Sequence, residues 1–183
     1  MGRREQIVES SLLVVAESGL KGLTHRAADK RAGLAEGSTG NLFPRRDDLI
    51  RAILRRLEAR DVASFAEAHA SRVSSPDDLA ALLAHGVEQM LAPEGETLTR
   101  VRFTMMLAYP QATEAFHARF LRTLEKVMVR AGVDDDVEER ARAVSSCFDG
   151  FLFHALSVDP RPVDTKAVAG AFRVLLSGSQ PNP

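Results

Sequence analysis

Apolar residues recur at helical spacing along most of the chain. A first amphipathic stretch covers residues 4–18, and a second continues from about 46 to 72. Further helical stretches are expected at 76–91, 97–108, 111–131, 134–158 and 163–176. Prolines, glycines and runs of aspartate separate them. The pattern therefore predicts an all-α protein of about nine helices.

Two short helices joined by a tight turn are predicted between the first two long stretches. Thr24 is a suitable cap for the first of them, which buries Ala32 among other alanines. Gly33 stands where the chain needs a left-handed backbone, and the second short helix spans about Glu36 to Asn41. This is the pattern of a helix-turn-helix, whose second helix can enter the major groove of DNA.

The charge distribution is compatible with a nucleic-acid partner for the N-terminal part. Residues 1–60 contain 12 Lys and Arg against 8 Asp and Glu, whereas residues 61–183 contain 12 against 17. A basic end attracts phosphate, and two chains on one duplex would strengthen this modest attraction. The acidic remainder is expected to face away from the DNA.

Cysteine usage and hydropathy predict the compartment. The single cysteine, Cys147, excludes an intrachain disulfide and suits a reducing cytoplasm. It is more typical of a small buried apolar residue than of a redox sensor. No run of about eighteen apolar residues and no signal-peptide pattern occurs. We therefore expect a cytoplasmic protein without a membrane anchor.

Several motifs follow one another in a fixed order between Ile7 and Leu54. They are Ser18-Gly19-Leu20 after the first helix, Thr24 opening the second, Ala32-Gly33-Leu34 at the turn, Gly37-Ser38 in the third, and Phe43-Pro44 before Arg46. In this order and spacing they make the segment resemble the DNA-binding domain of the TetR family of transcriptional regulators.

The resemblance implies a domain organisation and a function. It implies a helix-turn-helix DNA-binding domain at 1–45, a helical effector-binding and dimerisation domain at 46–178, and a disordered tail at 179–183. The implied protein is a homodimeric repressor that a small-molecule effector releases from a palindromic operator. Its partners would be double-stranded operator DNA, a second copy of the chain and the effector.

Exposed polar and basic positions of the helix-turn-helix are the candidates for DNA contact. They are Thr24, His25, Arg26, Glu36, Gly37, Ser38, Thr39, Asn41, Arg45 and Arg46. The resemblance supports Thr24, Arg26 and Arg46 most directly. Glu36 is either a base contact or an acidic helix start that repels phosphate. His25 either faces DNA or only begins its helix.

Two departures from the family pattern stand out. Gly40-Asn41-Leu42 replaces the two aromatic residues and the histidine that many members have before the phenylalanine. Asp29 lies four residues before Gly33, where a small residue usually lets two helices approach. The first departure keeps open an alternative function, a helical adaptor that has lost specific DNA binding.

The C-terminal part contains apolar residues with two possible roles. Candidates for an effector pocket are Phe103, Met106, Leu107, Tyr109, Phe116, Phe120, Phe148 and Phe151, although core packing is the favoured role for any one of them. The last two long helices are implied to form the dimer interface through Phe148, Leu152, Ala155, Leu156, Val168, Phe172 and Leu175.

The sequence lacks the motifs of an enzyme. It has no paired carboxylates, nucleophile turn or phosphate loop, and His85, His117 and His154 have no close-spaced partner of the kind a metal site needs. We therefore expect a protein without enzymatic activity, cofactor or metal.

Overall fold

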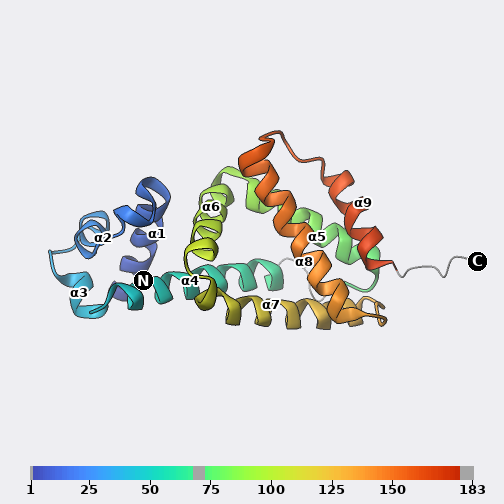
Figure 1. The fold of residues 1–183 in the computed structure, drawn as a ribbon, viewed down its shortest axis with the longest axis horizontal. Coiled ribbons are helices and arrows are strands. Elements are labelled where there is room, and N and C mark those ends of the chain that lie inside the picture. Colours follow the sequence, from blue (N-terminus) through green and yellow to red (C-terminus); the bar gives the residue numbers. More distant parts are fainter. Residues whose placement is uncertain (1, 68–72, 178–183) are drawn as a thin grey trace, which may run out of the picture. The chain divides into compact units, whose positions relative to one another are not determined.

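The computed structural model describes residues 2–67 and 73–177, except for the side chains of 62–67. The prediction of an all-α protein is confirmed, since the described residues form nine α-helices and no strand (Figure 1). The helices are α1 (Arg3–Gly22), α2 (His25–Ala32), α3 (Ser38–Leu42), α4 (Arg46–Glu67), α5 (Pro76–Leu91), α6 (Pro93–Ala108), α7 (Pro110–Arg130), α8 (Val137–Phe153) and α9 (Thr165–Leu176). The predicted disordered tail at 179–183 lies outside the described residues.

Helix boundaries follow the local signals with a few differences. α1 continues past its predicted end at residue 18 to Gly22, with a non-helical conformation at Gly19, and α3 is Ser38–Leu42 rather than about 36–41. Ser75 caps α5 as predicted, with its hydroxyl accepting a hydrogen bond from the Asp78 N–H at 3.1 Å. α6 begins at Pro93 rather than at residue 97, because proline fits the first helical position and acidic residues follow it in the first turn. α8 ends at Phe153, and the predicted continuation to 158 is a π-helical turn, His154–Val158.

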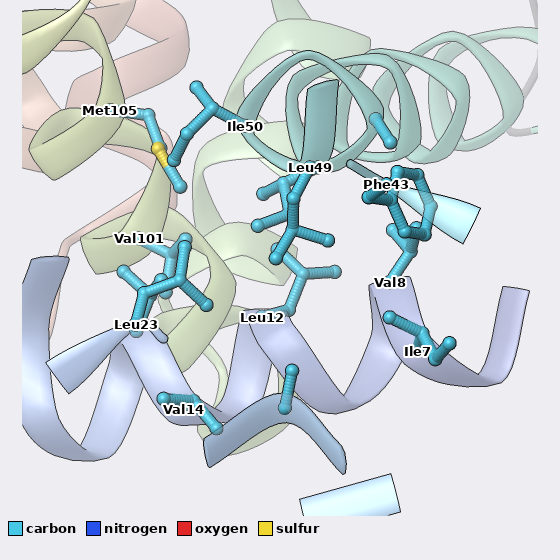
Figure 2. Packing of buried hydrophobic residues seen from close by; sticks show 14 of the residues in the cluster. Ile7, Val8, Leu12, Val14, Leu23, Phe43, Leu49, Ile50, Val101 and Met105 are labelled. Carbon is cyan, nitrogen blue, oxygen red and sulfur yellow. The ribbon is translucent and has the colours of Figure 1, made fainter. Parts of the chain in front are cut away.

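One compact unit of the chain consists of Met1–Asp61 and Thr97–Glu114. Its core is apolar, and Figure 2 shows side chains of α1, α4 and α6 directed into it together with Phe43. Ile7, Leu49 and Met105 have no exposed surface. Since burying one large apolar side chain contributes about 1.5–3 kcal/mol, this core is the main source of the unit's stability.

Ion pairs connect the helices of this first unit. Glu9 of α1 accepts a hydrogen bond from the Arg60 guanidinium of α4 at 2.7 Å and also pairs with Arg56. Arg102 of α6 pairs with Asp61 of α4, and both side chains are largely buried. Two basic residues of α4 are therefore neutralised by α1, which reduces the charge that the unit can offer to DNA.

The second unit consists of Val62–Glu96 and Ala115–Pro183. Within it α9 packs along α5 and α8 (Figure 1). Phe172 of α9 is fully buried, and its ring lies 6.2 Å from that of Phe148 and 5.9 Å from that of Phe151. The Arg173 guanidinium also donates to Asp77 of α5 at 2.6 Å. Arg140 of α8 donates to the Leu175 carbonyl of α9 at 3.0 Å. Aromatic packing and polar contacts thus join α9 to both of its neighbours.

Candidate nucleic-acid interface

The turn between α2 and α3 has the conformation that the sequence predicts. The Thr24 hydroxyl accepts a hydrogen bond from the Ala27 N–H at 3.1 Å, which caps α2. Gly33 ends α2 with φ 66°, a left-handed conformation that residues with a side chain rarely adopt. The predicted cap and turn are both confirmed, and they leave α2 and α3 as a helix-turn-helix.

A buried carboxylate connects α2 to the start of α3. Asp29 is 2% exposed, and its Oδ2 accepts from the Gly37 N–H at 2.8 Å. Its Oδ1 accepts from the Thr39 N–H at 2.7 Å and from the Thr39 hydroxyl at 2.5 Å. Burial alone would raise the pKa of Asp29, but the hydrogen bonds from Thr39 and Gly37 outweigh burial and hold this pKa below its ordinary value. Asp29 is therefore a charged group that binds the backbone of the turn.

Thr39 does not occupy the exposed position that the sequence analysis gave it. Its side chain has no exposed surface, and its hydroxyl donates a hydrogen bond to Asp29. The expectation that Thr39 is an exposed residue of α3 is wrong, because α3 is so short that one of its few side chains must face the core. Asp29 stands where the family usually has a small residue. Its carboxylate explains why a polar residue is buried at position 39, because it supplies the acceptor that a buried hydroxyl needs.

Arg46 also has a different environment from the one expected. Its guanidinium donates to the Leu20 carbonyl at 2.6 Å, to the Leu23 carbonyl at 3.4 Å and to the Tyr109 hydroxyl at 2.8 Å. Leu20 and Leu23 lie at the C-terminal end of α1, where carbonyls lack helical partners. Arg46 therefore caps α1 and contacts the residue after α6, and Tyr109, a pocket candidate, belongs to this contact.

The first turn of α1 holds the ends of the two short helices, a role that sequence analysis missed. Gln6 donates to the Ala32 carbonyl at 2.8 Å, and Arg4 donates to the Leu42 carbonyl at 3.1 Å. The Arg4 guanidinium also lies 4.2 Å from the centre of the Phe43 ring. No spacing rule indicates these contacts, because they join residues 26 and 38 positions apart.

The remaining predicted DNA contacts lie at or near the surface. Thr24, Arg26, Glu36, Gly37, Asn41 and Arg45 are exposed, as is Arg46 despite its bonds within the unit, and His25 and Ser38 are half-buried. The Nε of Arg26 and a carboxylate oxygen of Glu36 are 3.8 Å apart, and both side chains are exposed. This ion pair is therefore weak, and its partners can separate. The exposed set combines cations, a carboxylate and neutral polar groups along α2, the turn and α3.

The predicted dimer residues divide into buried and half-buried groups. Leu152, Val168 and Phe172 are buried within one chain, whereas Phe148, Ala155, Leu156 and Leu175 are half-buried. Three residues that the sequence analysis did not select are instead exposed, Phe153 at 47%, Val158 at 62% and Val174 at 73%. The four half-buried side chains keep some surface for a second chain, and these three exposed residues add to it.

The pocket candidates are divided between the two units. Phe103 and Met106 are half-buried residues of the first unit, and Leu107 is 80% exposed. In the second unit Phe116, Phe120, Phe148 and Phe151 are half-buried. The contacts of Phe148 and Phe151 with Phe172 favour core packing for these two rings.

Other kinds of site receive no support from the described residues. Among the side chains that the structure describes, those of residues 2–61 and 73–177, no three His, Cys, Asp or Glu are grouped as a metal site requires. None of the helices in this part of the chain combines the length and apolar content that crossing a bilayer requires. Cys147 is partly buried, and this burial raises the pKa of its thiol, which makes it less reactive.

Comparison with known proteins gives a consistent family. Residues 74–178 match the sequence profile of the family described as "Tetracyclin repressor-like, C-terminal domain". No curated protein sequence matches the chain.

Solved structures share the fold over almost the whole chain. A TetR-family member from Streptomyces coelicolor A3 has a TM-score of 0.82 at 24% identity, with 97% of this chain and 100% of that chain covered. A transcriptional regulator from Rhodococcus sp. Rha1 has a TM-score of 0.77 at 22% identity, with 96% and 94% covered. Multidrug binding protein EbrR, complexed with imidazole, has a TM-score of 0.76 at 25% identity, with 97% and 91% covered.

Proposed function

The chain belongs to the TetR family of transcriptional regulators, and we propose that it is a homodimeric repressor that binds a palindromic operator and leaves it when a small molecule binds. The observation that supports DNA binding best is the folded helix-turn-helix, with Thr24 capping α2, Gly33 at the turn, and Glu36 and Asn41 exposed before and in α3. Each chain of the dimer would place one α3 in the major groove of a half-site.

We assign the contacts with phosphate and the contacts with bases to different residues. Thr24, Arg26 and Arg45 are exposed at the starts of α2 and α4, where we propose that they bind phosphate. Ser38, Asn41 and Glu36 lie in or just before α3 and would contact base edges. Thr39 is omitted from this surface because it is buried, and Arg46, although exposed, because its guanidinium already donates to acceptors within the same unit.

The side chains of α3 favour particular bases. Between residues 35 and 42 the only charged residue is Glu36, so this segment lacks the Arg or Lys that usually binds guanine. Asn41 can form a bidentate contact with adenine, and Glu36 can accept a hydrogen bond from the cytosine amino group. We therefore propose that α3 selects adenine and cytosine in each half-site.

A substitution at Glu36 tests this base preference. Glu36→Gln removes the charged acceptor, so discrimination for cytosine at one position of each half-site should fall about tenfold. Binding to random duplex DNA should become stronger, because a negative charge next to phosphate is lost. Fluorescence anisotropy with the selected site and its single-base variants measures both effects.

The matched control is Glu138→Gln, which makes the same charge change on an exposed residue of α8. It should leave the base preference as it is. If Glu36→Gln keeps the full preference for cytosine, Glu36 does not contact the base.

Dimer formation is proposed to use exposed faces of α8 and α9. Ala143, Ser146, Gly150 and Phe153 follow one another at helical spacing on α8, and all are at least partly exposed. A Cβ atom added to Gly150 would meet nothing within 4 Å, so this face is open in one chain. Small residues let two helices approach, and Phe153 and Val174 supply apolar surface that association would remove from water.

Two observations support the proposal that a small molecule releases the protein from DNA. A protein of similar fold binds one, and two helices have residues in both compact units. EbrR binds imidazole in its solved structure, which shows that a protein of similar fold accepts a small ligand. In the present chain, α4 and α6 each contribute residues to both compact units. We propose that a ligand bound in the second unit favours a state in which these helices shift, which would misplace the two copies of α3 on the operator.

Selection from a pool of random duplexes tests the function as a whole. The dimer should enrich one palindromic sequence whose half-sites are about one helical turn apart, and its affinity should fall steeply as salt is raised. If no sequence is enriched even at low salt, the protein is not a DNA-binding regulator. That outcome would favour the helical adaptor, which the absence of aromatic residues at 40–42 makes the second candidate.

A further inference from the structure

We propose that Asp29 is the positioning residue of the DNA-binding surface, fixing the start of α3 so that its side chains meet the bases in one orientation. This inference rests on the proposed DNA-binding function. Asp29 is 2% exposed and lies on α2, so it acts through the residues it binds rather than through contact with DNA.

α3 has little means of holding itself in place. It contains five residues, too few for a helix that is stable by itself, and its N-cap residue is Gly37, which has no side chain to accept the first N–H groups. Asp29 supplies the missing acceptor from α2, since its two oxygens bind the Gly37 N–H and the Thr39 N–H at 2.8 and 2.7 Å. The carboxylate is therefore the N-terminal cap of α3, contributed by another helix.

The geometry of the carboxylate defines the orientation of α3 as well as its stability. One oxygen binds Gly37 before the helix, and the other binds both donors of Thr39 within it. Two anchor points on consecutive parts of the backbone restrict rotation of α3 about its own axis. Ser38 lies between these anchor points and Asn41 two residues beyond, so the direction of both side chains depends on them.

Three variants separate this positioning from simple stabilisation. Thr39→Val removes only the hydroxyl and keeps both backbone hydrogen bonds to Asp29. Asp29→Ala removes the acceptor and leaves the buried Thr39 hydroxyl without a partner, which is destabilising. The double variant Asp29→Ala/Thr39→Val removes that unpaired hydroxyl and should recover part of the stability. The backbone N–H groups of residues 37 and 39 still lack the carboxylate as an acceptor.

The experiment measures binding of the full-length dimer to the selected operator and to a random duplex. We expect Thr39→Val to keep the wild-type ratio of the two affinities. For Asp29→Ala and for the double variant, we expect the ratio of operator affinity to random-duplex affinity to fall at least about tenfold. The fall should come mainly from weaker operator binding, because the affinity for a random duplex depends on phosphate contacts. Urea unfolding of both variants checks that the double variant is the more stable one, in which case a ratio that stays low in both reports orientation rather than unfolding.

Amide hydrogen exchange provides a second readout that does not need DNA. Gly37 and Thr39 should exchange faster in the double variant than in Thr39→Val, while the amides of α1 should be unchanged. A double variant with the wild-type affinity ratio or unchanged exchange at these two amides would overturn the inference. If wild-type protein itself prefers no sequence, the proposed function fails, whereas the exchange result still decides whether Asp29 holds α3.

Discussion

Val174→Glu is expected to convert the proposed dimer to a monomer and to lower operator affinity at least about 100-fold. Val174 is 73% exposed in a single chain and lies on α9 at helical spacing from Ala167 and Gly170. In a two-fold symmetric interface each carboxylate would lose water without gaining a cation. A dimer that binds two half-sites has an affinity about 10²–10⁴ times higher than a monomer on one half-site, and the monomer would lose this gain.

Val129→Glu is the matched control for this prediction. It places the same charge at an exposed valine of α7, 56% exposed and outside the proposed interface. Sedimentation velocity at micromolar protein should show a monomer for Val174→Glu and a dimer for Val129→Glu, with wild-type circular dichroism in both. A stable Val174→Glu dimer would show that α9 does not form the interface in this way.

Phe43→Ala is expected to lower the free energy of unfolding of the first unit by about 3–5 kcal/mol. The Phe43 side chain has no exposed surface and belongs to the core shown in Figure 2. Its removal would leave a cavity beside residues of α1 and α4, and the Arg4 guanidinium would lose the ring it contacts at 4.2 Å. Urea unfolding followed by circular dichroism measures the loss.

Phe43→Leu provides a graded control because it retains most of the apolar volume. Its loss of stability should be clearly smaller than that of Phe43→Ala, since the cost of a core truncation grows with the cavity that remains. Equal losses for both variants would mean that the aromatic ring acts through a specific contact, such as that with Arg4, rather than by filling space.

Much of the fold could be predicted because it depends on local patterns. Apolar spacing identified nearly all helices, and the caps at Thr24 and Ser75 and the left-handed turn at Gly33 were found from residue type alone. The start of α6 was misplaced by four residues because proline and glycine near 93–95 suggested a break. Proline in a first turn is equally compatible with a helix start.

The site was less predictable because it depends on which groups meet in space. Exposure was inferred correctly for Arg26 and Asn41 on the two short helices and for Glu36 in the turn between them. It failed for Thr39, which is buried against Asp29. Motif matching placed Arg46 at the phosphate contact, yet its long side chain reaches three acceptors within its own domain.

The sequence by itself determined most of the helices, the caps Thr24 and Ser75, the turn at Gly33 and the resemblance to the family. These features depend on residues a few positions apart, whose interactions are set by helix geometry. The tertiary structure decided that Asp29 caps α3, that Arg46 caps α1, and that Phe172 lies in the core while Val174 stays exposed. Periodicity shows which positions share a face, but only the packed chain shows what covers that face and which acceptor a long side chain reaches.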